Sequence, residues 1–313
     1  MIKFFQEVNN IMDKYINQFN QIDDLLVKEN VLLKNYTTFE VGGPADLFLI
    51  PQKVEALQKL TKIINNNDIN YFVLGKGSNI IVGDKGYRGI IIYTGQLDKI
   101  SVIDNRVVAQ SGATLKNIAD VALKNSLTGI EFACGIPGSL GGAVFMNAGA
   151  YGGEMKDVIV KAQFVNQNGD LIELDKTELK LEYRTSILQK ENPDWAVADV
   201  TIELKKSKPD KIKAKMEELH HKRWSKQPME LPSAGSIFKR PEGHYTGALI
   251  EDAEMKGYQI GGAQVSTKHA GFIVNKDNAS AEDIIRLIQK IKEEVYKISG
   301  VQLEVEPRFL GEF

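Results

Sequence analysis

Residues 129–153 read GIEFACGIPGSLGGAVFMNAGAYGG and contain eight of the chain's 27 glycines, where an even spread would place about two. Glycine has no side chain, so such a run lets the backbone approach another group closely. Ser139 and Asn147 add polar groups, and the apolar residues between them suggest a wall beside the loop. This combination suits a dinucleotide with a flat ring. The alternative, a tight crossing of chain segments, explains a few glycines but not the two polar side chains.

A second glycine loop, GKGSN at residues 75–79, lies between the strand-like segments 71–74 and 80–82. A Rossmann dinucleotide fingerprint requires a third glycine at position 80 and a helix after it, but the chain has Ile80 and continues with strand character. A Walker phosphate-binding loop is absent as well. What remains is either a plain turn or a loop whose main-chain amides, with the serine and asparagine of the motif, hold a phosphate group.

Short apolar runs alternate with helical patterns around these loops, which is typical of small α/β units. We expect strands over 46–50, 71–74, 80–82, 89–93, 106–110, 162–166, 171–174 and 196–204, and helices over 54–66, 115–125 and 211–224. Residues 1 to about 30 have the apolar spacing of an amphipathic helix. The last helix is capped by Ser280, has Glu282 and Asp283 at its start, and carries an apolar stripe that ends before Gly300: Ile284, Ile285, Ile288, Ile291 and Val295.

The composition indicates a globular protein without a general affinity for polyanions. The 313 residues include 39 basic and 41 acidic side chains, so the net charge of −2 gives no reason to expect sequence-independent binding to nucleic acid or anionic lipid. Hydrophobic residues make up 43% and charged residues 26%, which excludes a disordered chain. No signal peptide is recognisable, and no stretch approaches the roughly 18 apolar residues of a membrane span. We expect a cytoplasmic protein that does not enter the membrane.

The chain offers neither a disulfide nor a recognisable metal site. Its single cysteine, Cys134, lies between Ala133 and Gly135, and we expect it to pack as a small apolar side chain; a reactive thiol is the alternative. The four histidines, at positions 220, 221, 244 and 269, lack the HxxxH or HExxH spacing of zinc ligands. We therefore predict no bound metal.

Five motifs follow one another along the chain: LGKGSN, GIPGSLGGAVFMNAGAYGGE, LEYRTS, SAGSIFKRP and LEVEPRFLG. The two glycine loops, with Gly42-Gly43-Pro44 upstream, resemble the FAD-binding domain of the vanillyl-alcohol oxidase superfamily. With the later motifs included, the chain resembles the UDP-N-acetylenolpyruvoylglucosamine reductase family from about residue 30 to the C-terminus. The later motifs are specific to that family, whereas the glycine loops alone indicate only the superfamily.

The resemblance implies an α+β fold, in which two small α/β units form a vanillyl-alcohol oxidase type FAD-binding domain and a C-terminal α/β domain binds substrate. The implied divisions are 1–100, to which 301–313 returns, 101–206 and 207–300. It also implies noncovalent FAD, NADPH as co-substrate, and conversion of UDP-N-acetylglucosamine enolpyruvate to UDP-N-acetylmuramate. That reaction belongs to peptidoglycan precursor synthesis, and so to cell shape and division. No obligate protein partner is expected.

The residues that the resemblance assigns to FAD lie in the two glycine loops and the segment upstream of them. They are Gly42, Gly43, Gly75, Lys76, Gly77, Ser78, Asn79, Gly135, Ile136, Pro137, Gly138, Ser139, Gly141, Gly142, Ala143 and Asn147. We expect main-chain amides, left accessible by the glycines, to grip the diphosphate.

By motif, the resemblance assigns the active-site arginine, serine and glutamate of the family to Arg184, Ser236 and Glu306. Hydride addition to an enolpyruvyl group pushes charge into its carboxylate, so the reaction needs a cation there. Arg184 would stabilise that charge, and Ser236 would protonate the neighbouring carbon. Glu306 would share a proton or position Arg184, and the family spacing favours it over Glu304.

Two basic residues that flank Ser236, Lys226 and Arg240, are expected to bind the anionic nucleotide sugar. Arg240 stands where the longer branch of the family has asparagine. That branch also carries an inserted tyrosine that closes over the substrate, and the segment between Arg184 and Lys226 is too short to contain it. The chain thus resembles the shorter branch.

Two other functions fit the glycine loops. A flavin-dependent sugar or alcohol oxidase of the superfamily usually tethers its flavin through histidine, and this chain has none before His220. A nucleotide-sugar sensor would have kept the fold and lost catalysis, which the intact catalytic set argues against.

Overall fold

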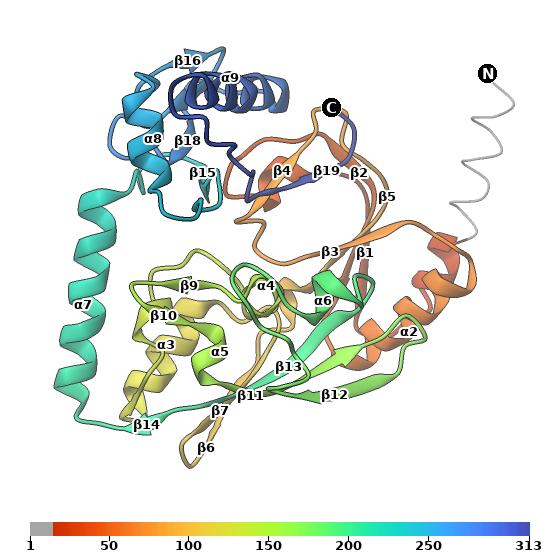
Figure 1. Ribbon diagram of the computed structural model, residues 1–313. Coiled ribbons are helices and arrows are strands. Elements are labelled where there is room, and N and C mark those ends of the chain that lie inside the picture. The colour runs from red at the N-terminus through yellow and green to blue at the C-terminus, as the bar shows by residue number, and fades with distance from the viewer. Residues whose placement is uncertain (1–14) are drawn as a thin grey trace, which may run out of the picture. The chain divides into compact units, whose positions relative to one another are not determined.

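The computed structural model describes residues 15–313 (Figure 1), and the chain divides into two compact units. Of the described residues, the first unit comprises 15–30, Asp46–Gly75 and Gly89–Lys215. The second unit comprises Val31–Ala45, Lys76–Arg88 and Met216–Phe313. The division into three domains stays a prediction. Of the helix expected over residues 1 to about 30, the part at 1–14 lies outside the described residues, and residues 15–19 are helical.

The first unit holds most of a four-stranded sheet in the order β1-β2-β5-β3. Its strands are β1 (Leu25–Leu32), β2 (Pro44–Pro51), β5 (Tyr87–Tyr93) and β3 (Tyr71–Leu74). Helix α2 (Val54–Asn66), whose bounds match the prediction, connects β2 to β3 and buries Leu57, Leu60 and Ile64. These residues share one side of the helix because they are three or four positions apart. Burial of each side chain contributes roughly 1.5–3 kcal/mol.

A second sheet of the first unit is antiparallel and runs in the order β12-β11-β13-β7-β6. Its strands are β12 (Leu171–Asp175), β11 (Ile159–Val165), β13 (Ala196–Glu203), β7 (Arg106–Gln110) and β6 (Ile100–Ile103). Helix α3 (Leu115–Lys124) begins at Thr114, whose side chain accepts a hydrogen bond from the Asn117 amide at 3.1 Å. The core around α2 extends to this sheet through Val165 and Ala196, so the two sheets share apolar contacts.

Helix α4 (Leu140–Met146) occupies a segment that the sequence predicts as loop. Glycine at its second and third positions disfavours a helix by about 1 kcal/mol each, which explains the wrong prediction. Leu140, Ala143 and Val144 are buried, so tertiary packing stabilises the turns that local propensity does not.

Short elements complete the first unit and the segments between its sheets. They are η2 (Thr94–Gln96), β8 (Leu127–Thr128), η3 (Glu131–Ala133), β9 (Gly149–Ala150), β10 (Gly153–Glu154), α5 (Met155–Val158), α6 (Ile187–Lys190) and β14 (Lys205–Lys206). Helix α7 (Pro209–Lys226) then leads from the first unit into the second.

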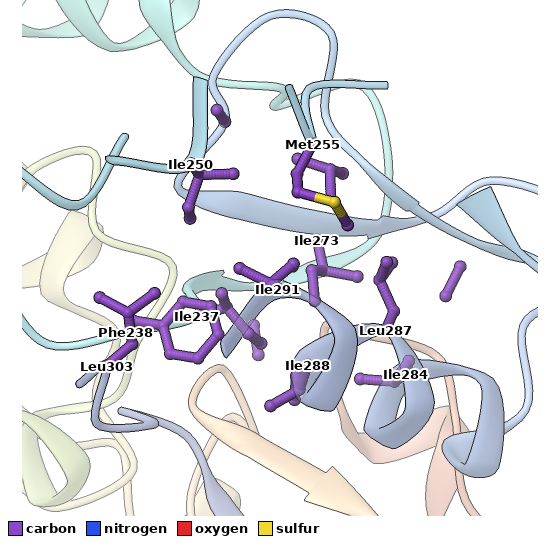
Figure 2. Close-up of a cluster of buried hydrophobic side chains, with 14 of the residues drawn as sticks. Ile237, Phe238, Ile250, Met255, Ile273, Ile284, Leu287, Ile288, Ile291 and Leu303 are labelled. Atoms are coloured by element: carbon purple, nitrogen blue, oxygen red, sulfur yellow. The ribbon is translucent and has the colours of Figure 1, made fainter. Parts of the chain in front are cut away.

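The second unit holds an antiparallel sheet in the order β15-β18-β17-β16. Its elements are β15 (Ser233–Ser236), α8 (Thr246–Asp252), β16 (Gln259–Ile260), β17 (Ala263–Val265), β18 (Phe272–Asn275) and α9 (Ala281–Ser299). Figure 2 shows the apolar side of α9 packed in the core of this unit, where Ile291 lies near Ile237 and Ile273. The sheet and α9 therefore share one hydrophobic core.

The predicted cap and bounds of α9 are confirmed. Ser280 Oγ accepts from the Asp283 amide at 3.0 Å, and Asp283 Oδ2 accepts from the Ser280 amide at 3.1 Å, a reciprocal capping box. Gly300 ends the helix with φ +69°, a conformation that glycine adopts without steric cost. Ile285 of the predicted stripe is half-buried, the other four members are buried, and Leu287, which the prediction did not include, is buried as well.

The C-terminal strand β19 (Arg308–Leu310) pairs in parallel with β4 (Ile80–Val82), within the second unit. The remaining element of this unit is η1 (Leu33–Tyr36). The loop at 83–86 is hydrogen-bonded to β19: the Gly83 amide donates to Leu310 O at 2.9 Å. Among residues 15–313, no helix is both long and apolar enough to cross a membrane.

Candidate active site

The glycine loop at 135–142 runs beside the segment between β7 and α3 in the first unit. The Leu115 amide donates to Gly138 O at 3.1 Å, the Leu140 amide to Ala113 O at 2.9 Å, and the Gly141 amide to Ser111 O at 2.8 Å. Hydrogen bonds within the protein therefore fix the backbone of this loop without any contribution from a ligand.

Ser139 is buried at this loop, and its hydroxyl faces Gly75. Its side chain is only 2% exposed, and its Oγ makes no hydrogen bond to the described part of the protein. A Cβ atom built on Gly75 would lie 2.2 Å from that Oγ, so residue 75 must be glycine. A Cβ on Gly142 would lie 3.7 Å from the same atom, an ordinary contact distance. The Ser139 hydroxyl thus lies between Gly75, which follows β3, and Gly142 of α4.

Three other predicted FAD residues are glycines of the second unit, and each is packed closely against another segment of the chain. A Cβ on Gly43 would lie 2.2 Å from Asp84 O, and one on Gly77 would lie 2.2 Å from Tyr36 O. A Cβ on Gly42 would lie 2.5 Å from the Val82 Cβ. At these three positions the close approach of another chain segment accounts for glycine. Whether they also contact FAD stays a prediction, as it does for Lys76 and Ser78.

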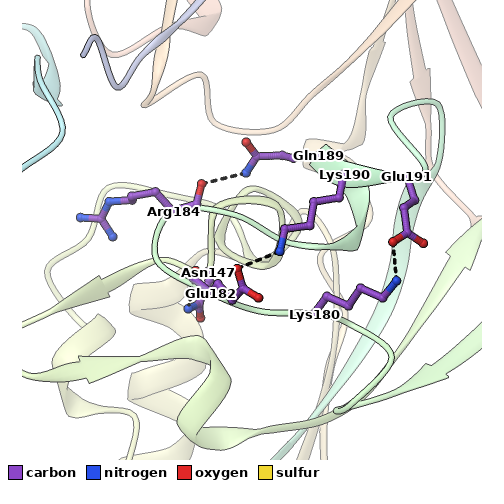
Figure 3. Close-up of polar contacts among 7 residues, drawn as sticks. All are labelled: Asn147, Lys180, Glu182, Arg184, Gln189, Lys190 and Glu191. Atoms are coloured by element: carbon purple, nitrogen blue, oxygen red, sulfur yellow. Dashed lines mark hydrogen bonds and ion pairs between the residues drawn. The ribbon is translucent and has the colours of Figure 1, made fainter. Parts of the chain in front are cut away.

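Arg184 lies in a two-residue turn in the first unit. The amides of Glu182 and Thr185 each donate to the other's carbonyl at 3.2 Å, so Tyr183 and Arg184 form the tip. Arg184 has φ +56°, in the left-handed region, and its guanidinium lies 5.3 Å from the Tyr183 ring centroid. Figure 3 shows its side chain extending away from the residues that hold the turn.

The turn is attached to the C-terminal end of α4. Asn147 Nδ2 donates to Glu182 O at 3.0 Å and to Glu154 Oε2 at 2.9 Å, and Asn147 Oδ1 accepts from the Lys156 amide at 2.9 Å. Gln189 Nε2 donates to Arg184 O at 3.1 Å. Asn147 is 1% exposed and both its amide hydrogens are engaged within the protein. It positions the Arg184 turn, and its predicted contact with FAD stays a prediction.

Ser236 and Glu306 lie on adjacent segments of the second unit. Ser236 ends β15, where Gly235 has φ +77°, and the register of β15 with β18 shifts between Ser233 and Ser236. The next residue, Ile237, is fixed on both sides: its amide donates to Gly271 O at 2.9 Å and its carbonyl accepts from the Glu306 amide at 3.0 Å. These hydrogen bonds therefore hold the backbone of Glu306 next to the residue that follows Ser236.

Asn79 belongs to the same group of segments. Its Nδ2 donates to Glu306 O at 3.4 Å, and its carbonyl accepts from the Arg308 amide at 3.0 Å. The neighbouring carboxylate, Glu304, is exposed and forms an ion pair with Lys239, whereas Glu306 is half-buried. Burial thus agrees with the preference for Glu306 over Glu304.

The two residues predicted to bind substrate are both exposed and both lie in the second unit. Lys226 is the last residue of α7. Arg240 is oriented by its neighbours: the guanidinium lies 4.1 Å from the Tyr245 ring centroid, and Nε donates to His244 O at 3.1 Å. Tyr245, which is 68% exposed, was not singled out by the sequence reasoning; an aromatic residue five positions after an arginine is not in itself a signal.

Comparisons with known proteins identify the family. Residues 45–175 match a family described as FAD binding domain, and residues 227–310 match UDP-N-acetylenolpyruvoylglucosamine reductase, C-terminal domain. A UDP-N-acetylenolpyruvoylglucosamine reductase from Clostridium novyi is 48% identical over 93% of this chain and 94% of its own length. One from Clostridium botulinum (strain Alaska E43) is 48% identical over 94% and 96%. The crystal structure of the Thermus caldophilus enzyme matches with a TM-score of 0.80 at 34% identity, covering 91% of this chain and 99% of that one.

The chain belongs to the UDP-N-acetylenolpyruvoylglucosamine reductase family. It shares the α+β fold of that family, with an FAD-binding domain and a C-terminal domain. These relatives are named as reductases, and the oxidase reading of the glycine loops is not favoured.

The loop of this family member fits FAD through one of the residues expected to contact it, Ser139. The amides of Ile136, Gly138, Leu140, Gly141 and Ala143 already donate to protein carbonyls. They are therefore not free to grip a diphosphate, and an amide cradle at these five positions is not what the structure offers. What it offers instead is the buried Ser139 hydroxyl, which has no acceptor in the described part of the protein and needs one. Phosphate and sugar oxygens of FAD are suitable acceptors.

Proposed function

We propose that this chain is an FAD-dependent reductase that uses NADPH to convert UDP-N-acetylglucosamine enolpyruvate to UDP-N-acetylmuramate. The observation that carries the proposal is 48% identity to a named reductase over 93% of the chain. FAD, when bound, would supply the hydride chemistry that links NADPH to the enolpyruvyl group. The residues of this chain bind the substrate, stabilise the charge that develops and deliver a proton.

Arg184 is the residue proposed to stabilise that charge. A guanidinium offers a planar fork of donors that matches a carboxylate. The turn that carries it is fixed at both ends by backbone bonds and attached to α4 through Asn147. A donor held in place in this way stabilises a developing charge without reorganising during the reaction.

Ser236 is the proposed proton donor to the carbon beside the carboxylate. A serine hydroxyl is a weak acid, so it protonates only a strongly basic intermediate held within hydrogen-bond reach. The bonds of Ile237 to Gly271 and Glu306 fix the backbone next to Ser236. Glu306, half-buried and on the adjacent segment, is proposed to assist by positioning or proton sharing. Lys226 and Arg240 are proposed to bind the diphosphate of the substrate.

The two half-reactions test this proposal separately under anaerobic conditions. NADPH is expected to bleach the flavin absorbance of the holoenzyme, and added UDP-N-acetylglucosamine enolpyruvate is expected to restore it. Flavin that NADPH reduces but the enolpyruvyl nucleotide leaves reduced would contradict the proposed substrate.

Ser236→Ala is expected to leave flavin reduction by NADPH intact and to slow reoxidation by the enolpyruvyl nucleotide at least about 100-fold, because only the second step needs the proton. Stopped-flow absorbance measures both rates. Ser233→Ala, on the same strand, is the matched control, since the Ser233 carbonyl and not its side chain accepts from Thr38 Oγ1 at 2.7 Å. Equal loss of both half-reactions in Ser236→Ala would remove this serine from the proton-donor role.

A further inference from the structure

Two serine hydroxyls are buried among residues 15–313 without a hydrogen-bond partner in that part of the chain, those of Ser139 and Ser111. The exposed fractions of these residues are 2% and 1%. A buried hydroxyl with no partner is destabilising, so proteins retain few of them without a reason. Ser139 belongs to the predicted FAD residues. Ser111 does not, and no step of the proposed mechanism uses it.

The backbone of Ser111 is fixed against the glycine loop. Its amide donates to Ala198 O at 2.9 Å, and its carbonyl accepts from the Gly141 amide at 2.8 Å. A Cβ built on Gly141 would lie 3.0 Å from the Ser111 Cβ, a separation tighter than nearly all real contacts. Gly141 therefore lets the two segments meet, and the Ser111 side chain is held at the loop that also carries Ser139.

Both serines with unpartnered hydroxyls lie at the same loop, inside the FAD-binding domain at 45–175: Ser139 is part of the loop, and the backbone and Cβ of Ser111 contact Gly141. Ser266 shows the contrast. It is 4% exposed, yet its Oγ accepts from the amides of Lys268 and His269 at 3.1 and 3.3 Å. A buried serine hydroxyl in this chain can thus be hydrogen-bonded by the protein itself, and the two that are not belong to residues at one loop. The shared location points to one polar ligand for both.

We infer that Ser111 is a second hydroxyl ligand of FAD, which donates, together with Ser139, to oxygen atoms of the polar part of the dinucleotide. The inference depends on FAD binding, which is part of the proposed function, and on no step of the reaction. Ser111 lies in AQSGATL, where nothing in the sequence distinguishes it from a turn residue before α3. Only the unpartnered hydroxyl reveals it.

The test is the affinity of the full-length protein for FAD, measured on the holoenzyme by the flavin released on dilution. Ser111→Ala is expected to raise the dissociation constant about tenfold, the effect of one lost hydrogen bond to a charged or polar ligand. Ser111→Cys, which keeps most of the volume but donates weakly, is expected to show a similar loss. Ser266→Ala, the matched buried control, is expected to leave the dissociation constant unchanged.

A second readout separates a ligand contact from a structural one. The melting temperature rises with free FAD according to the affinity of the folded state. In Ser111→Ala this FAD-dependent rise is expected to shrink, while the melting temperature at limiting FAD stays equal or increases, because an unsatisfied hydroxyl has been removed. An unchanged dissociation constant with a lower melting temperature at limiting FAD would overturn the inference, since the hydroxyl would then have a structural partner such as water. Wild-type protein that binds no FAD would instead contradict the proposed function.

Discussion

Arg184 adopts a left-handed backbone conformation, φ +56°, that side chains other than glycine and asparagine rarely adopt. Such a residue costs about 1 kcal/mol or more and persists only where its surroundings fix it. Here the surroundings are the bonds of Asn147 to Glu182 O and of Gln189 to Arg184 O (Figure 3). The ion pair of Glu182 with Lys190, which lowers the pKa of Glu182, lies on the exposed side of the same turn.

At this residue we expect Arg184→Lys to slow reoxidation of the flavin by the enolpyruvyl nucleotide roughly 100-fold, since lysine keeps the charge but loses the planar fork. Flavin reduction by NADPH is expected to be unaffected, and stopped-flow absorbance measures both steps. Arg106→Lys is the control, because Arg106 is exposed and forms an ion pair with exposed Glu203 at 3.0 Å. Full activity of Arg184→Lys would show that a point charge suffices.

At the scale of elements, the end of β3 and the start of α4 depend on each other through Gly75 and Ser139. Gly75→Ala is expected to lower the free energy of unfolding by about 1–3 kcal/mol, because the new Cβ would lie 2.2 Å from Ser139 Oγ. In a Ser139→Ala background the same change is expected to cost less, since the two Cβ atoms would be 3.5 Å apart. Urea unfolding of the wild type, the two single variants and the double variant, all at one FAD concentration, gives the coupling energy between residues 75 and 139. An equal cost in both backgrounds would mean that the two elements do not meet there.

The elements that sequence predicts well are those in which local signals and packing agree. Helix α9 has a cap, an acidic first turn, an apolar stripe and a terminal glycine, and α2 has a regular apolar face. Prediction failed at α4, where glycines disfavour the helix that burial of Leu140 and Val144 stabilises. The short strands β15 to β18 were also not predicted, because they have two to four residues each and no run long enough to show alternation.

The site shows the same limit. Sequence motifs point to Ser139 and Arg184 as functional residues. They do not predict the backbone conformation of a residue or the hydrogen bonds that it makes. The attachment of the Arg184 turn to Asn147 and the bonds of the Leu140 and Gly141 amides to Ala113 and Ser111 join segments that are distant in sequence. Such contacts exist only in the folded chain.

At the scale of the whole molecule, the proposed catalytic residues are divided between the two compact units. Arg184 belongs to the first, and Ser236 and Glu306 belong to the second. Each unit is assembled from separate stretches of chain, and α7 contributes residues to both. A fragment that ends at Lys215 therefore contains every stretch of the first unit but only part of the second, and it lacks Ser236 and Glu306.

Stability of the molecule is expected to depend on pH through His269 in the second unit. Burial, the largest effect, lowers the pKa of His269 from its ordinary 6.5, only partly offset by a backbone hydrogen bond and the charge of Glu251. Its Nδ1 accepts from the Gly271 amide at 3.1 Å, and its ring meets the edge of Phe272 at 5.1 Å, contacts that suit the neutral form. Because the folded state binds the proton less readily than the unfolded state, the contribution of His269 is complete above about pH 7 and is lost as the pH falls through 6.5 towards the lowered pKa.

We therefore expect the free energy of unfolding of the wild type to decrease, relative to that of His269→Gln, by up to about 1.4 kcal/mol per pH unit below pH 6.5. The comparison between the two proteins cancels the groups that they share, and urea unfolding at several pH values measures it. His221→Gln, which replaces an exposed histidine of α7, is the control and is expected to follow the wild type. Parallel curves for the wild type and His269→Gln would mean that the imidazole binds its proton equally well in the folded and unfolded states, against the burial that Phe272 and Gly271 impose.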